Sequence, residues 1–191
     1  MCSRYTIIGT RLLAERFGGP VLFPRYNCAP GQHLPVVTVD LTIQEAVFGL
    51  RRRDGARQIN GRFERLFESA SKRRSRCLVP MSGFYEWKSV GSRREPWYIS
   101  SPDTPLLYAA GLTTGDAFLI ITCPALPPVS TVHDRMPLLL SEEGGVAYLA
   151  GGDLRPADTS LQIIRVGMAI NHPDAPDDPS LISPPDLHDW W

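Results

Sequence analysis

The sequence predicts an α+β domain built around a curved, barrel-like and mainly antiparallel sheet, flanked by short helices. Three observations indicate this class. Short β-branched and aromatic segments recur along most of the chain, few segments show helical periodicity, and glycine- and proline-containing turns separate them. The 191 residues are 43% hydrophobic and 21% charged, ordinary globular values that predict one domain with a buried core.

The first half of the chain supplies strands and two helices. The strands are expected at residues 2–8 and 34–39, and residues 46–50 are another short apolar run. Apolar residues at helical spacing predict helices at residues 10–17 and 63–72. Two segments rich in turn-forming or basic residues are predicted to be loops, at 24–31 and 51–58.

The second half predicts successive strands and ends in a tail. The strands are expected at residues 76–80, 83–88, 97–100, 106–112, 117–122, 136–140 and 161–166. A hairpin through Val90-Gly91-Ser92 joins two of them, and Ser141 caps a short helix. Prolines and aspartates dominate from His172 onward. We therefore expect a domain at residues 1–171 and an extended or poorly ordered tail at 172–191.

Composition also narrows the class of protein. No apolar run approaches the length of a membrane span, and the N-terminus lacks the basic and long apolar regions of a secretory signal. The four cysteines are scattered without a Cys-x-x-Cys pair, so neither a disulfide framework nor a metal site is expected. A cytoplasmic protein without a cofactor is predicted, with Cys28, Cys77 and Cys123 as packing residues.

The net charge is zero, but the charge is unevenly distributed. Residues 51–76 are strongly basic, and the tail after Asn171 is acidic. The basic residues are Arg51, Arg52, Arg53, Arg57, Arg62, Arg65, Lys72, Arg73, Arg74 and Arg76. Such a segment could face the phosphates of a nucleic acid or be a solvated surface, and composition leaves both interpretations open.

Cys2 directly follows the initiator methionine. If Met1 is removed, Cys2 carries a free α-amine and a thiol on adjacent carbons, two nucleophiles that titrate near or above neutral pH. Such a 1,2-aminothiol condenses with an aldehyde to an imine, and the thiol then closes a five-membered thiazolidine. A cysteine that merely follows the start codon is the alternative, so partners for this chemistry must be found elsewhere in the chain.

Three polar residues occupy distinctive local contexts. Asn60 lies where the basic loop meets the helix expected from Phe63, and could act in a site or simply cap that helix. Glu86 lies among aromatic residues, where a carboxylate suits acid–base work, although an exposed strand glutamate paired with Lys88 is the alternative. His133 precedes an acidic and a basic residue and is either a general acid–base group or a surface histidine in a turn.

The order of five short blocks is more specific than any one of them. The blocks are Met1-Cys2-Ser3-Arg4, Tyr26-Asn27-Cys28-Ala29-Pro30, Ile59-Asn60-Gly61-Arg62-Phe63-Glu64, Gly83-Phe84-Tyr85-Glu86-Trp87-Lys88 and Val132-His133-Asp134-Arg135-Met136-Pro137. This series resembles the SRAP family (SOS-response-associated peptidases), also called abasic-site processing proteins. The resemblance extends from Met1 to about Asn171, nearly the whole chain.

The resemblance implies a covalent reaction with DNA. The family removes Met1 and uses the amine and thiol of Cys2 on the open-chain aldehyde of an abasic site in single-stranded DNA. The product is a thiazolidine DNA–protein crosslink that shields the lesion. By the same resemblance, Asn60 orients the thiazolidine, Glu86 assists imine chemistry and ring closure, and His133 assists proton transfer at the sugar, including ring opening and crosslink reversal.

The resemblance also implies DNA contacts. Arg4 and Arg62 match arginines that hold phosphates, and Asn27 matches a residue of the active-site loop. The further DNA contacts expected from these blocks and from the arginine loop are Trp87, Arg135, Arg51 and Arg52. Contacts with the backbone predict salt-sensitive binding that is independent of sequence, here by a monomer to single-stranded DNA containing abasic sites.

Three positions depart from the family pattern. Ser3 replaces the usual glycine beside Cys2, and its Cβ changes how closely backbone or DNA can approach. Gly61 stands where alanine is common. The family often has a tryptophan-containing segment after Phe48-Gly49-Leu50, and arginines 51–53 stand there instead. Charge or guanidinium–base contacts could replace the lost aromatic wedge.

Two other functions remain open from the sequence. One is an N-terminal-nucleophile amidase or autoprotease that uses the Cys2 thiol with His133 and Glu86 as activators. The other is a non-catalytic single-strand binding module that uses the basic segment at residues 51–76.

Overall fold

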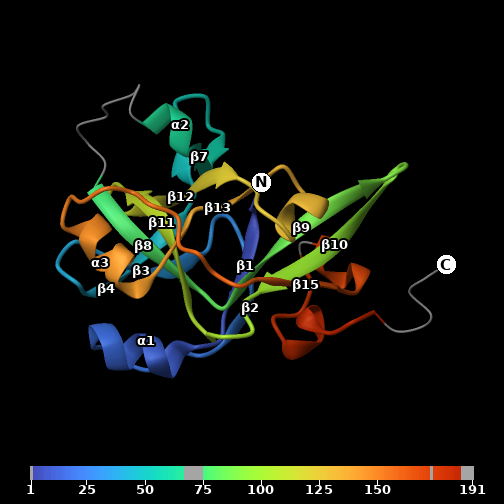
Figure 1. Cartoon of the computed structure of the whole chain (residues 1–191), viewed down its shortest axis with the longest axis horizontal. Coiled ribbons are helices and arrows are strands. Elements are labelled where there is room, and N and C mark those ends of the chain that lie inside the picture. Colours follow the sequence, from blue (N-terminus) through green and yellow to red (C-terminus); the bar gives the residue numbers. More distant parts are fainter. Residues whose placement is uncertain (1, 67–74, 173, 186–191) are drawn as a thin grey trace.

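The computed structural model describes residues 2–66, 75–172 and 174–185. A closed barrel and an adjoining five-stranded sheet make up most of it, with helices at the periphery (Figure 1). The predicted α+β class, with its curved and mainly antiparallel sheet, is confirmed. No helix in the described part of the chain is both long and apolar enough to cross a membrane.

The barrel closes because β12 pairs with both β4 and β11. Its ring runs β12–β4–β3–β8–β11 and back to β12. Its strands are β3 (His33–Val37), β4 (Ile43–Phe48), β8 (Ser75–Met81), β11 (Leu107–Thr113) and β12 (Ala117–Pro124). Three short strands extend it, namely β7 (Asn60–Arg62), β13 (Arg135–Pro137) and β14 (Leu139–Leu140). Both β7 and β13 pair with β12, so the ends of these three strands meet at one end of the barrel.

The second sheet has the order β15–β10–β9–β1–β2. Its strands are β1 (Arg4–Ile7), β2 (Arg25–Cys28), β9 (Gly83–Val90), β10 (Arg93–Ser100) and β15 (Gln162–Arg165). The predicted hairpin through residues 90–92 is present, and β9 and β10 form the long arm of Figure 1. Tyr5 of β1 packs edge-on against Phe48 of β4, at 5.7 Å between ring centroids, which joins the sheet to the barrel core.

Ser82 and Gly83 form the junction at which the chain leaves the barrel and enters the sheet. The Ser82 Oγ accepts hydrogen bonds from the backbone N–H groups of Ile8 and Gly9, at 2.9 and 3.0 Å. Gly83 has no room for a side chain, because a Cβ there would lie 2.4 Å from the Tyr98 ring. This junction sets where β9 starts, and therefore where Glu86 lies in the sheet.

The helices are short and lie outside the barrel. They are α1 (Thr10–Phe17), α2 (Phe63–Leu66) and α3 (Glu142–Leu149), with 3-10 turns η1 (Val129–Thr131), η2 (Met168–Asn171) and η3 (Pro179–Ile182). The helix predicted at 10–17 is confirmed, and Ser141 caps α3 by accepting from the Gly144 N–H at 3.0 Å. The helix predicted at 63–72 is described only at 63–66, and the rest of that prediction lies outside the described residues.

Two predicted loops contain strands. Residues 25–28 form β2 instead of a loop, because Cys28 pairs with Tyr5 and is buried in the core. The turn-forming residues on either side only bound this strand. Residues 51–58 form a small hairpin of β5 (Leu50–Arg51) and β6 (Arg57–Gln58). The single strand predicted at 136–140 is divided into β13 and β14.

The expected lack of order in the tail is wrong for residues 174–185. Leu181 is buried in a small second core with Tyr85, Tyr98 and Ile170, on the face of the sheet opposite the barrel core. Residues 186–191 of the predicted tail lie outside the described residues. The acidic composition did not predict this order, because a few apolar side chains and the Asp177 carboxylate hold the segment against the sheet.

Candidate active site

Cys2 lies just before β1 and is fully buried. Burial raises the pKa of its thiol well above the ordinary value, and the nearby Glu86 carboxylate raises it further. The Sγ donates to the Arg4 carbonyl at 3.7 Å. At neutral pH the thiol is therefore protonated, and it needs a base before it can act as a nucleophile.

Asn60 reaches Cys2 from the barrel side. Its Nδ2 donates to the Cys2 carbonyl at 3.0 Å, across 58 positions of sequence. The alternative that Asn60 caps a helix is wrong, because Asn60 begins β7 and pairs with Ile120 in a parallel ladder. The Asn60 Oδ1 is buried without a hydrogen-bond partner among the described residues, so an acceptor lies beside Cys2.

Glu86 is buried on the barrel-facing side of β9. Alternation along the strand places Phe84 in the main core, whereas Tyr85 and Trp87 contact the second core. The alternative of an exposed glutamate paired with Lys88 is wrong, since Glu86 is 0% exposed and Lys88 lies at the surface. Burial raises the pKa of the Glu86 carboxyl to about 7, so both of its protonation states are populated at neutral pH.

His133 follows η1 at the end of the barrel where β7 and β13 flank β12. Burial lowers the pKa of its imidazole, which favours the neutral ring. The Nδ1 lies 3.0 Å from the Arg135 N–H and 2.9 Å from the Asp134 carboxylate. The neutral ring accepts the Arg135 N–H at Nδ1 and so carries its proton on Nε2, whereas the protonated ring donates from Nδ1 to Asp134.

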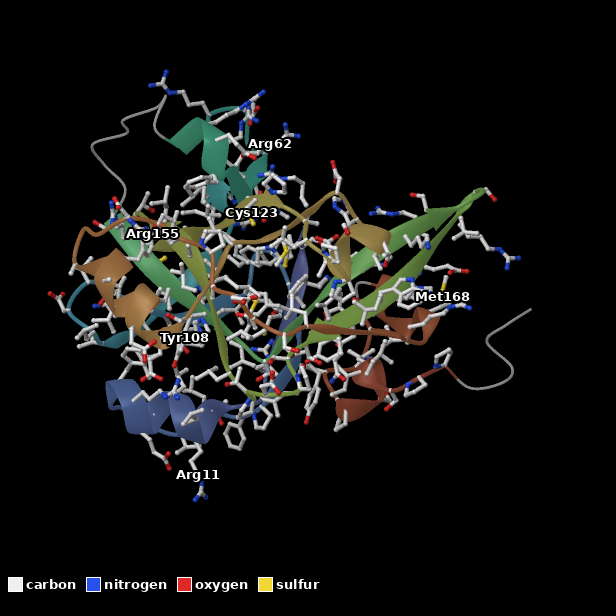
Figure 2. The ribbon with its side chains drawn as sticks, viewed as in Figure 1. Arg11, Arg62, Tyr108, Cys123, Arg155 and Met168 are labelled. Atoms are coloured by element: carbon white, nitrogen blue, oxygen red, sulfur yellow. The ribbon has the colours of Figure 1, made fainter. Side chains whose placement is uncertain are left out.

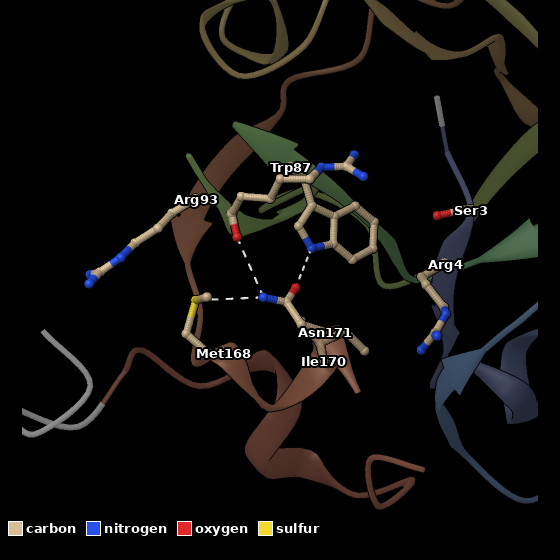
Figure 3. A pocket seen from close by; sticks show the side chains of 8 residues that line it. Ser3, Arg4, Trp87, Arg93, Met168, Ile170 and Asn171 are labelled. Carbon is tan, nitrogen blue, oxygen red and sulfur yellow. Dashed lines mark hydrogen bonds between the residues drawn. The ribbon is translucent and has the colours of Figure 1, made fainter. Parts of the chain in front are cut away.

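Arg4 and Asn27 form a pair on the adjoining strands β1 and β2. The Arg4 guanidinium donates to the Asn27 Oδ1 at 2.5 Å. Arg4 points away from the barrel core, because it pairs in register with Tyr85 and lies on that residue's face of the sheet. It therefore lies close to Cys2 in the chain while its charge is directed toward the open face (Figure 3).

The Arg135 side chain is buried and is hydrogen-bonded to other residues of the protein. Its guanidinium donates to both carboxylate oxygens of Glu64, at 2.6 and 3.0 Å, and to the Thr122 carbonyl at 2.6 Å. Its side chain is only 10% exposed. The prediction that Arg135 contacts DNA does not fit this environment, and we assign it instead to holding α2 against β12 and β13.

Replacing Glu64 with glutamine is expected to lower the free energy of unfolding at pH 7 by roughly 1–2 kcal/mol, because Arg135 loses its charged partner. The hydrogen bond from Arg135 lowers the pKa of Glu64 to about 2. A lowered pKa contributes stability above the unfolded value, and this contribution is lost as the pH falls toward 2. Urea denaturation of both proteins should show their difference at pH 7 and its decrease below about pH 4.5. A difference that is constant over this range would contradict the assignment.

The remaining predicted DNA contacts are exposed arginines. Arg62 ends β7, in the strand that also carries Asn60, and lies at the same end of the molecule as Cys123 of β12 (Figure 2). Arg51 and Arg52 lie in the β5–β6 hairpin, where Arg52 pairs with Asp54 at 3.2 Å. These side chains are available to phosphates, but only Arg62 shares a strand with a predicted catalytic residue.

A pocket of about 430 Å³ opens beside Ser3, the next residue in the chain after Cys2, on the face of the second sheet opposite the barrel core (Figure 3). It is lined by Ser3, Arg4, Trp87, Arg93, Arg94, Met168, Ile170 and Asn171. The Trp87 Nε1 donates to the Asn171 Oδ1 at 2.5 Å, and the Arg94 guanidinium lies 5.8 Å from the centre of the Trp87 ring. Arg93, Arg94 and Asn171 were not predicted as site residues from the sequence. The register of the predicted hairpin could have placed the two arginines, since it brings β10 beside Trp87.

Comparisons with known proteins identify the family of this chain. Residues 1–172 match the family model described as SOS response associated peptidase (SRAP). The chain belongs to the SRAP family. The abasic site processing protein YMR114C of Saccharomyces cerevisiae is 38% identical over 94 residues, which cover 44% of this chain and 26% of the yeast protein. The match therefore spans about a quarter of the yeast relative's length.

Other SRAP relatives match over more of their length. The abasic site processing protein YoaM of Bacillus subtilis is 27% identical over 173 residues, covering 75% of this chain and 76% of YoaM. A crystal structure of a protein from Bacteroides thetaiotaomicron matches with a TM-score of 0.74 at 22% identity, over 96% of this chain and 99% of that chain. This structural likeness confirms the fold.

Proposed function

We propose that this SRAP protein reacts with abasic sites in single-stranded DNA through Cys2, once Met1 has been removed, and forms a thiazolidine crosslink. The observation that carries the proposal is that Cys2 lies close to two groups, the Asn60 amide, which holds its carbonyl, and Glu86, a buried carboxyl whose pKa is about 7. The names of relatives such as YoaM, an abasic site processing protein, support the choice of substrate.

The proposed reaction has two bond-forming steps. The Cys2 α-amine adds to the aldehyde carbon of the opened sugar, and the resulting carbinolamine loses water to give an imine. The thiol then adds to the imine carbon while the nitrogen gains a proton, which closes the ring. The overall change is one aldehyde and one aminothiol converted to one thiazolidine and one water.

The surrounding groups fit the proton transfers that these steps require. As an acid, Glu86 protonates the departing hydroxyl of the carbinolamine, and as a carboxylate it then takes the proton of the Cys2 thiol. A pKa near 7 suits a group that performs both tasks at neutral pH. The neutral imidazole of His133 carries its proton on Nε2 and can donate it to the ring oxygen of the sugar while water takes the proton of the C1 hydroxyl, which opens the ring and exposes the aldehyde.

DNA binding is assigned to the charged residues around Cys2. Arg4 and Arg62 hold phosphates on two sides of the reacting residue, and Trp87 offers an aromatic face beside it. The Asn60 Oδ1 accepts an N–H of the Cys2 nitrogen during the reaction, which satisfies an otherwise unpartnered atom. Such contacts predict binding that weakens with salt and is independent of sequence.

The experiment compares two single-stranded oligonucleotides that contain uracil, one treated with uracil-DNA glycosylase and one untreated. N-terminal mass spectrometry first establishes that the protein sample begins with Cys2. We expect a heat-stable band of reduced mobility only with the abasic oligonucleotide. Its absence with correctly processed protein would overturn the proposal. Equal non-covalent binding to both oligonucleotides would instead indicate a binding module, and turnover of an amide substrate would indicate an amidase.

A further inference from the structure

Residues 168–172 and 174–182 lie on the face of the second sheet opposite the barrel core and contact both of its halves. At one end, Asn171 accepts from the Trp87 indole and its Nδ2 donates to the Arg94 carbonyl at 3.4 Å. At the other end, Asp177 contacts β2. We call residues 168–172 and 174–182 the C-terminal strap. Its contacts with β2 lie beyond residue 172, where the match to the family model ends.

Asp177 is the main polar contact between the strap and β2. Its Oδ1 accepts the backbone N–H groups of Tyr26 and of Asn27, the latter at 2.8 Å. Its Oδ2 accepts from the Arg25 guanidinium. One carboxylate thus binds the backbone of two consecutive residues and the side chain of a third in a four-residue strand.

Asn27 passes this constraint to Arg4. Its Nδ2 donates to the Ala175 carbonyl of the strap at 3.2 Å, and its Oδ1 accepts from the Arg4 guanidinium at 2.5 Å. The Asn27 side chain is buried, with 5% of its surface exposed, so its two contacts fix its orientation. The bond to the strap occupies the amide nitrogen of Asn27 and therefore directs the amide oxygen toward the Arg4 guanidinium.

Packing holds the strap against the same face of the sheet. Ile170 and Leu181 are buried against Tyr85 and Tyr98, and the Tyr85 hydroxyl donates to the Tyr26 carbonyl at 2.9 Å. Arg4 and Trp87, which both line the pocket beside Ser3, are each bonded to a residue that the strap holds or contains. The two sides of the pocket are connected through this one segment.

We propose that the C-terminal strap orients Arg4 for a DNA phosphate, and that Asp177 is the positioning residue that acts through Asn27. The inference rests on the proposed function for its ligand, single-stranded DNA. Asp177 does not touch the reacting atoms. Through Asn27 it holds the Arg4 side chain in one of the many conformations that this side chain could otherwise adopt. An arginine that is ordered in advance loses less conformational entropy when it binds.

The test measures binding of an abasic single-stranded oligonucleotide by fluorescence anisotropy, in full-length protein that carries Cys2→Ala so that no crosslink forms. Asp177→Asn is compared with Asp178→Asn, which makes the same charge change at the next residue. Among the described residues, the Asp178 carboxylate bonds within its own turn, where it accepts from the N–H and the hydroxyl of Ser180, and asparagine can cap that turn equally well. We expect Asp177→Asn to weaken binding roughly 5- to 20-fold, the scale of one charged contact, and Asp178→Asn to change it less than 2-fold.

A double-mutant comparison separates positioning from a general loss of structure. If Asp177 acts through Arg4, Asp177→Asn should weaken binding less than 2-fold in protein that already carries Arg4→Gln. A purely structural role would weaken binding by the same factor in both backgrounds. Equal affinities of the Asp177 and Asp178 variants, or an undiminished effect without Arg4, would overturn the inference.

Three further checks distinguish the positioning role of Asp177 from unfolding and from failure of the proposed function. Hydrogen exchange should accelerate at the Tyr26 and Asn27 amides in Asp177→Asn and not in Asp178→Asn, which tests the hold on β2 without DNA. If Asp177→Asn does not fold, Asn27→Ala interrupts the same relay and must weaken binding to the same extent. The crosslinking assay with Cys2 intact tests the proposed function separately, so a protein that binds DNA without crosslinking would overturn that function and leave the strap to be judged by affinity.

Discussion

Replacement of Cys2 by serine is expected to abolish the heat-stable crosslink to an abasic oligonucleotide. The α-amine remains and can still form an imine, but the hydroxyl is a far poorer nucleophile for ring closure. The yield should fall by a factor on the order of 10³ or more, the scale seen when a covalent nucleophile is removed. Denaturing electrophoresis after heating measures the loss.

Borohydride separates the roles of the amine and the thiol in this variant. Reduction should trap the imine of Cys2→Ser as a stable amine, so a shifted band returns only when borohydride is present. Cys123→Ser is the matched control, since Cys123 is also a buried thiol but lies in β12. That control should crosslink like the wild type. A heat-stable band from Cys2→Ser without borohydride would contradict the thiazolidine.

Replacement of Glu86 by glutamine is expected to slow crosslinking about 100-fold, the lower range for loss of a general acid–base group. Glutamine keeps the size of the side chain but can neither take the thiol proton nor protonate a leaving hydroxyl. The affinity for DNA should change less than 2-fold, because the buried Glu86 touches no phosphate. Single-turnover rates at saturating protein, measured from pH 5 to 9, should lose an inflection near pH 7. Equal losses of rate and affinity would exclude the proposed role.

The same variant should be more stable than the wild type at alkaline pH. Burial raises the pKa of Glu86 from 4.5 to about 7 in the folded protein, so the folded state favours the protonated carboxyl. That preference contributes fully below about pH 4.5 and is lost as the pH rises through 7. At pH 8 the buried carboxylate costs roughly 3 kcal/mol relative to the protonated form, and Glu86→Gln removes this cost. Thermal denaturation should show a gain at pH 8 that becomes small at pH 5.

The candidate site was largely predictable because its residues lie in compact blocks of sequence. Glu86 could be placed by the alternation of β9, and Cys2 by its own chemistry. Asn60 was placed correctly in the chain but not in its element, because a short strand and a helix cap share polar, glycine-containing sequences. Its bond to the Cys2 carbonyl spans 58 positions and has no local signature.

Contacts over long separations account for what the sequence did not reveal. Asp177 meets Asn27 across 150 positions, and nothing in an acidic, proline-rich tail distinguishes that carboxylate from its neighbours. Arg135 is expected to contact DNA because it lies in the sequence block of His133, whereas in the structure its guanidinium binds Glu64, 71 positions away. The closed barrel also depends on such pairings, since β12 meets β4 in parallel.

The burial of Cys2 also affects how its thiol reacts with other chemicals when no substrate is bound. A thiol that is enclosed and protonated reacts slowly with peroxides and alkylating agents, which attack the exposed thiolate. Under the proposed function, burial therefore keeps Cys2 as a reduced thiol until a substrate reaches it. In an alkylation time course, iodoacetamide should modify Cys2 of the folded protein much more slowly than Cys2 of the denatured protein. Such a difference would show that the fold protects this thiol from reagents other than its substrate.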